Sequence, residues 1–246
     1  MIPSLNRTPA AGLSFRRRRV SKWKILIWTL VIVLLAVPIT SGVVGWVLTH
    51  PAKKPLTTTP ASVGLAYDDV TFTSRDGTKL RGWWLPGGDE QRVVVMAHGF
   101  RGNREGEPAL PTAQALVAQG ISVLLFDFRN SGESDGEMTT VGLFEKEDLL
   151  AAIDYVEGAG HGGQGIGLLG FSMGAATALM AAADAPEVQA VVADSPFSDL
   201  QTYLGENMPH WTHLPDFPFT SVILWELPYL IGHDPKEISP IAAVDR

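Results

Sequence analysis

The feature that most constrains the fold is the ten-residue stretch GLLGFSMGAA at residues 167–176. It begins as an apolar strand, continues as Gly-x-Ser-x-Gly around Ser172, and predicts a helix from Met173 to about Ala183. A serine on such a strand-to-helix turn is lifted above the sheet, where its hydroxyl can attack a substrate. Glycines two positions before and after it allow close backbone approach. Ser172 is therefore the predicted nucleophile, and an incidental serine in a glycine-rich turn is the alternative.

Apolar strands alternate with predicted helices along the chain from residue 67 onward. A hairpin is predicted through the Asp76-Gly77 turn, because β-rich runs flank it on both sides. Alternating strands and helices imply a mostly parallel sheet with helices on both faces, preceded by this N-terminal hairpin. The further predicted strands are residues 92–97, 121–126 and 188–193, and the further predicted helices are residues 110–119 and 144–157.

Composition excludes several classes of site. The chain has no cysteine, which rules out disulfides, thiolate metal sites and thiol nucleophiles. Residues 1–50 carry seven Lys or Arg side chains and no acidic one, whereas the remainder carries 12 basic and 26 acidic side chains. An acidic domain of this kind argues against nucleic-acid binding. Neither a metal nor an organic cofactor is expected, because no metal-ligand cluster and no phosphate-binding glycine loop is found.

The segment from Ile25 to Leu48 carries no charge over 24 residues. At about 1.5 Å per residue it is long enough to cross a hydrocarbon core of about 30 Å. Trp23, Trp28 and Trp46 lie near its ends, where indole rings favour the membrane interface. This pattern predicts an uncleaved transmembrane helix. A cleavable signal peptide is the alternative, although its apolar region is usually only about 7–15 residues long.

Charge around this segment predicts a single-pass protein of the cell membrane. The basic tail at residues 1–24 is expected to stay in the cytoplasm, which places the chain after the apolar segment outside. Residues 49–66 are rich in Pro and Thr and predict an extended linker, a spacer that lifts the following domain off the membrane. That domain is expected to cover residues 67–246.

Other candidate residues surround the predicted nucleophile. The backbone N–H groups of Met173 and Phe100 are the predicted donors to an oxyanion. His98 precedes Phe100 in the same loop, and we expect it to hydrogen-bond this loop more readily than to serve as the base, which should lie opposite the nucleophile. Asp194 ends a strand and is either the acid that orients a base or the cap of the following Ser-Pro turn.

Four motifs in order resemble those of α/β-hydrolases, especially the membrane-anchored Bem46-like and serine-aminopeptidase-like groups. They lie at residues 93–102, 127–134, 170–174 and 193–197. The resemblance implies that Asp127 and Arg129 brace the loops beside the active site. It also implies an orienting Asp and a base His on later strands, yet no histidine follows His233. The sequence therefore predicts a C-terminally incomplete domain, with an open edge at residues 188–193, poor folding and weak turnover.

These observations predict a membrane-anchored serine hydrolase that cleaves esters, and less readily amides or peptides. Residues 201–233 are rich in aromatic side chains and proline, and predict a cap with an apolar acyl pocket or ordinary packing against the core. The expected partners are a small-molecule or lipid-like acyl substrate and the membrane. The alternative is a non-catalytic hydrolase-like binding domain or an inactive fragment.

Overall fold

The structure is a computed structural model that describes residues 21–106 and 108–244. Most of the predicted basic tail at residues 1–24 therefore lies outside the described residues. The chain divides into two compact units, Met1–Ala36 and Val37–Arg246, so the division falls within the first helix.

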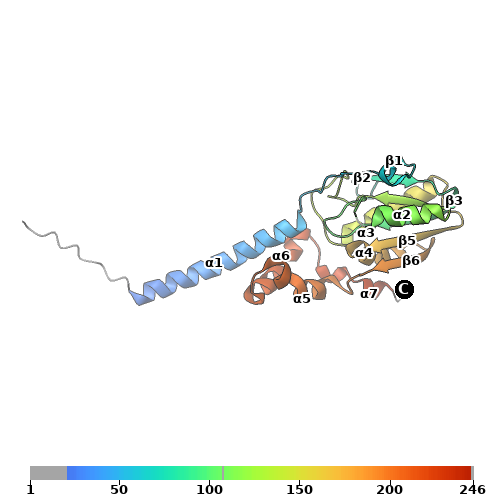
Figure 1. Ribbon diagram of the computed structural model, residues 1–246. Helices are drawn as coiled ribbons and strands as arrows, with labels where there is room; N and C mark the ends of the chain where they lie inside the picture. The colour runs from blue at the N-terminus through green and yellow to red at the C-terminus, as the bar shows by residue number, and fades with distance from the viewer. Residues whose placement is uncertain (1–20, 107, 245–246) are drawn as a thin grey trace, which may run out of the picture. The chain divides into compact units, whose positions relative to one another are not determined.

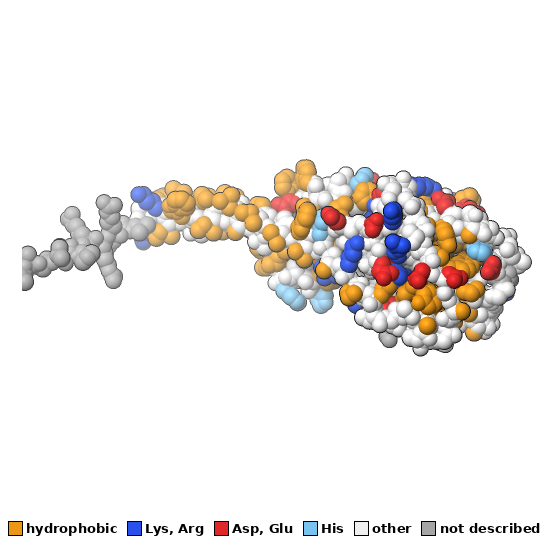
Figure 2. All heavy atoms as spheres, turned by 90° about the horizontal axis from the view of Figure 1, so that it is seen from above, with side chains coloured by type: hydrophobic (Ala, Val, Ile, Leu, Met, Phe, Trp, Pro, Cys, Tyr) orange, Lys and Arg blue, Asp and Glu red, His pale blue; other side chains and the backbone are white. Residues whose placement is uncertain are grey.

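The first helix, α1 (Lys22–Thr49), contains the whole predicted membrane segment. Its described surface is lined by hydrophobic side chains, with basic side chains at its beginning (Figure 2). The sequence has Lys22 and Lys24 in this first turn. By length and composition, α1 is suited either to cross a membrane or to act as a signal sequence. Pro38 lies inside the helix without ending it.

The sheet has six strands in the order β1-β2-β4-β3-β5-β6. β1 pairs antiparallel with β2, and β2 with β4, whereas the β4-β3-β5-β6 part is parallel throughout. This arrangement confirms the predicted hairpin followed by a parallel sheet (Figure 1). The bounds are β1 (Asp68–Thr73), β2 (Lys79–Leu85), β3 (Asp89–Ala97), β4 (Ile121–Phe126), β5 (Gly165–Phe171) and β6 (Val188–Asp194).

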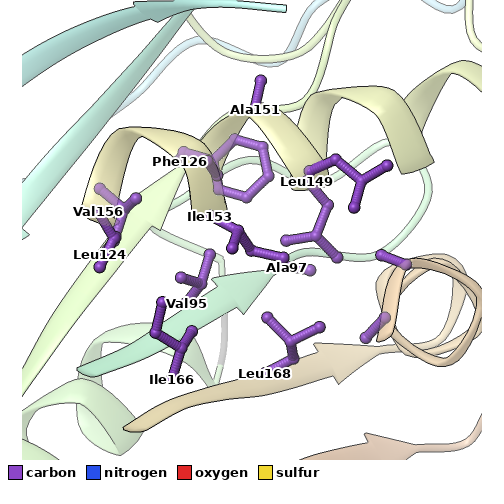
Figure 3. Close-up of a cluster of buried hydrophobic side chains, with 14 of the residues drawn as sticks. Val95, Ala97, Leu124, Phe126, Leu149, Ala151, Ile153, Val156, Ile166 and Leu168 are labelled. Atoms are coloured by element: carbon purple, nitrogen blue, oxygen red, sulfur yellow. The ribbon is translucent and has the colours of Figure 1, made fainter. Parts of the chain in front are cut away.

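Helices cover both faces of this sheet. On one face, α2 (Ala109–Ala118) packs against apolar side chains of β2, β3 and β4. On the other face, α3 (Leu143–Gly158) and α4 (Met173–Ala182) bury the main core. Side chains of β3, β4 and β5 point toward α3 in Figure 3. The apolar stripe predicted for α3 is confirmed, because Leu149, Ile153 and Val156 are fully buried.

The segment between α1 and the sheet does not behave as a spacer. Side chains of Leu56, Val63 and Leu65 pack on the core that α2 covers. Backbone carbonyl groups of the segment also accept hydrogen bonds from the domain: Asn130 Nδ2 donates to Pro51 at 3.2 Å. The predicted extended spacer is therefore docked on the domain along part of its length, because Pro- and Thr-rich composition sets an extended backbone without excluding its docking on a nearby surface.

The last part of the described chain follows β6. It consists of α5 (Leu200–Thr212), the single π-turn η2 (Asp216–Thr220), α6 (Ser221–Ile231), the 3₁₀ turn η3 (Pro235–Glu237) and α7 (Pro240–Ala243). Residues 201–233, interpreted above as a cap, thus fold mainly as α5 and α6. Within the described sheet β6 is an edge strand, and Val192 on it is 59% exposed.

Candidate active site

The candidate site lies where neighbouring parallel strands end. Ala97 of β3 pairs in register with Gly170 of β5, so the turns after both strands leave the same edge of the sheet. The two turns are in close contact, because a Cβ placed on Gly99 would lie 3.6 Å from the Cβ of Ser172. The loop after β3 and the predicted nucleophile are therefore neighbours in space.

Ser172 occupies a strained backbone conformation. Its φ of 51° and ψ of −113° lie in a region that side-chain-bearing residues rarely adopt. Its N–H donates to the carbonyl oxygen of Asp194 at 2.8 Å, and its own carbonyl accepts from the N–H of Ala176 at 3.0 Å. These bonds hold the turn between β5 and α4, while the side chain of Ser172 stays exposed.

Two glycines make this turn possible. A Cβ on Gly170 would overlap the backbone of Gly174, and a Cβ on Gly174 would overlap the carbonyl group of Ala97. The same Cβ on Gly174 would also lie 2.6 Å from the carbonyl oxygen of His98. The spacing Gly-x-Ser-x-Gly therefore brings α4 into direct contact with the end of β3.

The predicted oxyanion donors lie at the same place. Met173 is the first residue of α4, where N–H groups have no acceptor within the helix and the helix dipole is positive. Phe100 follows Gly99 in the loop after β3. Both residues line the cavity onto which Ser172 opens. The N–H groups of Met173 and Phe100 remain the predicted donors to an oxyanion.

A cavity of about 310 Å³ opens beside Ser172, and its wall is almost entirely apolar. The loops after β3 and β5 and residues 139–141 line one part of the cavity, and α5 and α6 line another part. The end of α1 completes the wall. The apolar residues contributed by α1, α5 and α6 are Gly45, Leu48, Leu200, Leu204, Met208, Trp211, Ile223, Leu227 and Ile231.

Sequence reasoning missed Glu145, which shapes one wall of this cavity. Its fully buried carboxylate accepts hydrogen bonds from the Thr139 hydroxyl at 2.6 Å, the Thr140 hydroxyl at 2.7 Å and the Gly142 N–H at 2.8 Å. Between them, Val141 is held at a φ of 59°, an outlier for a β-branched residue. The available signal was a Glu in the first turn of a helix preceded by two threonines, a pattern typical of helix starts.

His98 is engaged in the loop on both sides of its ring. Nδ1 lies 2.8 Å from the carbonyl oxygen of Gly99, and Nε2 accepts from the N–H of Phe128 at 3.1 Å. These partners require a neutral ring with its proton on Nδ1. Burial lowers the pKa of His98, against the opposing effect of the Gly99 carbonyl and nearby carboxylates. In this arrangement neither nitrogen is free to take a proton from a serine.

The buried neutral His98 predicts a pH dependence of stability. Unfolding exposes the ring, which then binds a proton more readily than in the folded protein. The free energy of unfolding is therefore highest above the ordinary pKa of 6.5 and decreases as the pH falls below that value. The expected slope is up to about 1.4 kcal/mol per pH unit. Thermal denaturation in detergent between pH 7.5 and 5 should show this slope, and His98→Gln should reduce it. The exposed His210→Gln variant is the control, and an equal reduction there would contradict the assignment.

The other predicted residues do not form a base and acid pair at the cavity. The carboxylate of Asp194 accepts from the hydroxyl of the adjacent Ser195 at 2.7 Å and is exposed. Asp194 meets Ser172 only through its backbone carbonyl. All six histidines are in the part of the chain that the structure describes, and none of them lines the cavity.

Asp127 and Arg129, expected to brace the loops, are buried and take part in two separate sets of ion pairs. Asp127 accepts from the guanidinium and, at 2.7 Å, from the N–H of Arg104. Arg129 binds Asp148 of α3, with Nη2 2.6 Å from Oδ1, and Asp76 of the hairpin turn at 2.7 Å. Although burial opposes its charge, these two carboxylates raise the pKa of Arg129. The ion pairs of Arg129 connect the loop after β4 to α3 and to the hairpin turn.

Among the described residues that line the cavity, none carries a charged side chain. The lining residues that carry a hydroxyl group are Thr49, Thr139, Thr140, Ser172 and Tyr203. Across residues 21–106 and 108–244, no group of three or more His, Asp or Glu side chains is placed to hold a metal ion.

Comparison with known proteins places these features in context. The family model for the alpha/beta hydrolase fold matches residues 92–229. The protein YfhR of Salmonella typhi is 32% identical over 184 residues, which cover 68% of this chain and 60% of YfhR. The thiohydrolase aneE of Aspergillus aculeatus is 37% identical over 147 residues, or 58% of this chain and 45% of aneE. The chain thus spans about half to three fifths of the length of these relatives.

Among solved structures, an esterase of Pyrococcus furiosus, Pf2001, superposes with a TM-score of 0.63. The sequences are 33% identical, and the superposition covers 72% of this chain and 67% of the esterase.

Proposed function

The chain belongs to the α/β-hydrolase family, and on this premise we propose that it is a membrane-anchored serine hydrolase that cleaves esters with an apolar acyl group. The observation that carries the proposal is the position of Ser172. It stands exposed on a strained turn, at the N-terminus of α4, and opens onto a cavity whose wall is apolar. The esterase and thiohydrolase among its relatives support hydrolysis of acyl compounds.

In the proposed reaction, the Oγ atom of Ser172 attacks the carbonyl carbon of the ester. The carbonyl oxygen becomes an oxyanion facing the N–H groups of Met173 and Phe100. When it collapses, the bond to the alcohol oxygen breaks, and the alcohol leaves with the proton that the serine lost. Water then attacks the acyl-serine, releases the carboxylic acid and returns a proton to Oγ.

The described residues supply a nucleophile and oxyanion donors to this reaction. His98 is held by Gly99 and Phe128, so we do not assign it the role of general base. Esters are favoured over amides, because an alcohol leaves more readily than an amine when acid–base assistance is weak.

A substrate series tests the proposed function. We expect the full-length protein in detergent to hydrolyse p-nitrophenyl esters, with kcat/KM rising from acetyl to medium-chain acyl groups that fill the apolar cavity. The corresponding anilides should react more slowly. Binding of these acyl groups without hydrolysis of any ester would instead support the alternative of a non-catalytic hydrolase-like domain.

The proposed anchor predicts a definite topology. Because basic residues precede the apolar segment of α1, the part of the chain after His50 should lie outside the cytoplasm. Protease added to intact cells or spheroplasts should therefore remove it. Protection until the membrane is lysed would refute the orientation, and recovery of a soluble chain that begins after the apolar segment would identify a cleaved signal instead.

A further inference from the structure

Helix α6 is apolar on all of its sides. Over Ser221–Ile231 it carries a single charged side chain, that of Glu226. Ile223, Leu227 and Ile231 line the cavity beside Ser172. On another side Trp225 and Tyr229 form an edge-to-face pair and are 65% and 76% exposed. A surface helix of a soluble protein normally keeps a polar face toward water, and α6 has none.

A third side of α6 contacts the end of α1. A Cβ placed on Gly45 would lie 2.5 Å from Cδ1 of Leu230, and one on Gly42 would lie 3.5 Å from Oε2 of Glu226. Leu48 packs in the same cluster as the buried side of α6. These contacts lie within the compact unit that begins at Val37. The small residues of α1 thus let α6 lie directly against it.

These contacts determine the depth of α6 if α1 spans a membrane. At about 1.5 Å per residue, Gly42 lies about 9 Å before the end of the apolar segment at Leu48. The headgroup region on each side of a bilayer is only about 5–8 Å thick. An element packed beside Gly42 and Gly45 therefore reaches the hydrocarbon boundary of the outer leaflet.

Hydrogen bonds hold the domain close to the end of α1 and to the segment that follows it. The N–H of Thr139, on the cavity wall, donates to the carbonyl oxygen of Thr49 at 2.8 Å. Lys53 Nζ likewise donates to the carbonyl oxygen of Ser134 at 2.6 Å. The cavity is thus attached directly to the last turn of α1.

The surface beside this contact has the composition of a membrane interface. Phe217 in η2 is 81% exposed, and with Trp225 and Tyr229 it forms what we name the aromatic face. Residues 200–231 include no Lys or Arg, so attraction to anionic headgroups does not explain such a surface. Trp and Tyr rings are enriched where one side of a residue is apolar and the other wet, as at the level of lipid headgroups.

We propose that the aromatic face of η2 and α6 lies in the outer leaflet of the bilayer and that the cavity beside Ser172 receives a lipid-like ester from that leaflet. This inference rests on the proposed function, from which it takes the anchor and the ester chemistry. The cavity wall supports it directly, because Gly45 and Leu48 of α1 line the cavity together with α6. An acyl chain in the cavity would therefore contact the same end of α1 that packs against α6.

Site-directed spin labelling tests the position of the aromatic face. The chain has no cysteine, so Phe217→Cys and Tyr229→Cys each give one labelling site in the full chain. In nanodiscs of zwitterionic lipid, both nitroxides should be more accessible to oxygen than to a water-soluble nickel complex, at low and high salt alike. Ile241→Cys on α7, 59% exposed, is the matched control and should show the opposite preference.

One further label and one spectral comparison separate the possible failures. Leu34→Cys on α1 should report lipid if the anchor is correct. If the label at Leu34 reports lipid and the labels at Phe217 and Tyr229 report water, the position of the aromatic face is wrong and the anchor is retained. If all three labels report water, the proposed anchor is wrong as well. Spectral broadening at Tyr229 that appears only in nanodiscs holding two chains would show a second copy on this face, which also overturns the inference.

Activity provides an independent measurement. The triple variant Phe217→Ser, Trp225→Ser, Tyr229→Ser should hydrolyse a long-chain ester embedded in vesicles about tenfold more slowly, because burial of the aromatic rings in lipid is lost. Its rate with a short soluble ester should be unchanged, since none of the three residues lines the cavity. Equal rates of the triple variant and the wild type on the embedded ester would contradict delivery from the leaflet. Absence of any ester hydrolysis by the wild type would refute the proposed function, while the spin labels would still place the aromatic face.

Discussion

Replacing Ser172 with alanine is expected to reduce covalent labelling by a fluorophosphonate probe to background. The probe reacts with activated serine hydroxyl groups, and Ser172 is the serine that the strained turn presents to the cavity, next to the loop after β3. Ester turnover should fall by ~10³-fold or more, because the acyl-enzyme route is lost and only binding and oxyanion stabilisation remain. In-gel fluorescence and initial rates with a p-nitrophenyl ester provide the two measurements.

Two serines near the site serve as controls for this substitution. Ser131 is buried in the loop after β4, and Ser195 donates its hydroxyl to Asp194 at 2.7 Å. Neither lines the cavity, so Ser131→Ala and Ser195→Ala should keep the label. Labelling that persists in Ser172→Ala and disappears in one of the controls would move the nucleophile. Absence of labelling in the wild type would favour a domain that binds without turnover.

Local patterns were sufficient to predict most of the elements. The strand at residues 121–126 has the predicted bounds, because a run that is apolar except for Ser122, between a glycine and an aspartate, leaves little freedom in where a buried strand begins and ends. β3 begins three residues earlier than predicted, at Asp89. Its first residues are polar, so no apolar pattern marks where the strand begins. The turn at Ser172 was predictable because its glycines act within a few residues of the serine.

Interactions between distant segments were not predictable in the same way. The docking of residues 50–66 depends on partners such as Asn130 and Ser134, which lie about 80 residues away, and composition does not reveal them. The packing of α6 on α1 depends on Gly42 and Gly45, which in sequence resemble ordinary tolerated residues of an apolar helix. A single sequence predicts elements well where the determining contacts are local.

The residues of the candidate site were also predictable where local patterns determine them, and not where they depend on distant segments. The positions of Ser172, Met173 and Phe100 at one cavity follow from the ends of adjacent strands, as the sequence implied. The role of Glu145 was missed, because a helix-start glutamate ordinarily faces water and its burial depends on a surrounding loop. The partners of Arg129 were also unpredicted: Asp76 and Asp148 come from the hairpin and α3, far apart in the chain.

Replacing Gly174 with alanine is expected to lower activity about 10²-fold and to weaken labelling at Ser172, while Ser172 itself is retained. The added Cβ would overlap the carbonyl group of Ala97 and lie 2.6 Å from the carbonyl oxygen of His98, both backbone atoms of the turn that carries Phe100. Because no flexible side chain can yield, α4 must move away from β3, and Met173 and Phe100 then no longer face one oxyanion. A displacement of about 1 Å in such a site typically costs about 10²-fold in rate.

A neighbouring glycine provides the matched control for this prediction. Gly167 lies in β5, the strand that leads to Ser172. A Cβ there would be 3.6 Å from Cγ2 of Val94, an ordinary contact distance. Gly167→Ala adds the same methyl group to the same segment and should keep the label and near-normal turnover. Equal activity of Gly174→Ala and Gly167→Ala would show that contact between α4 and the loop after β3 is not needed. Loss in Gly174→Ala with an unchanged melting temperature would assign the effect to the geometry of the site, since unfolding would lower both.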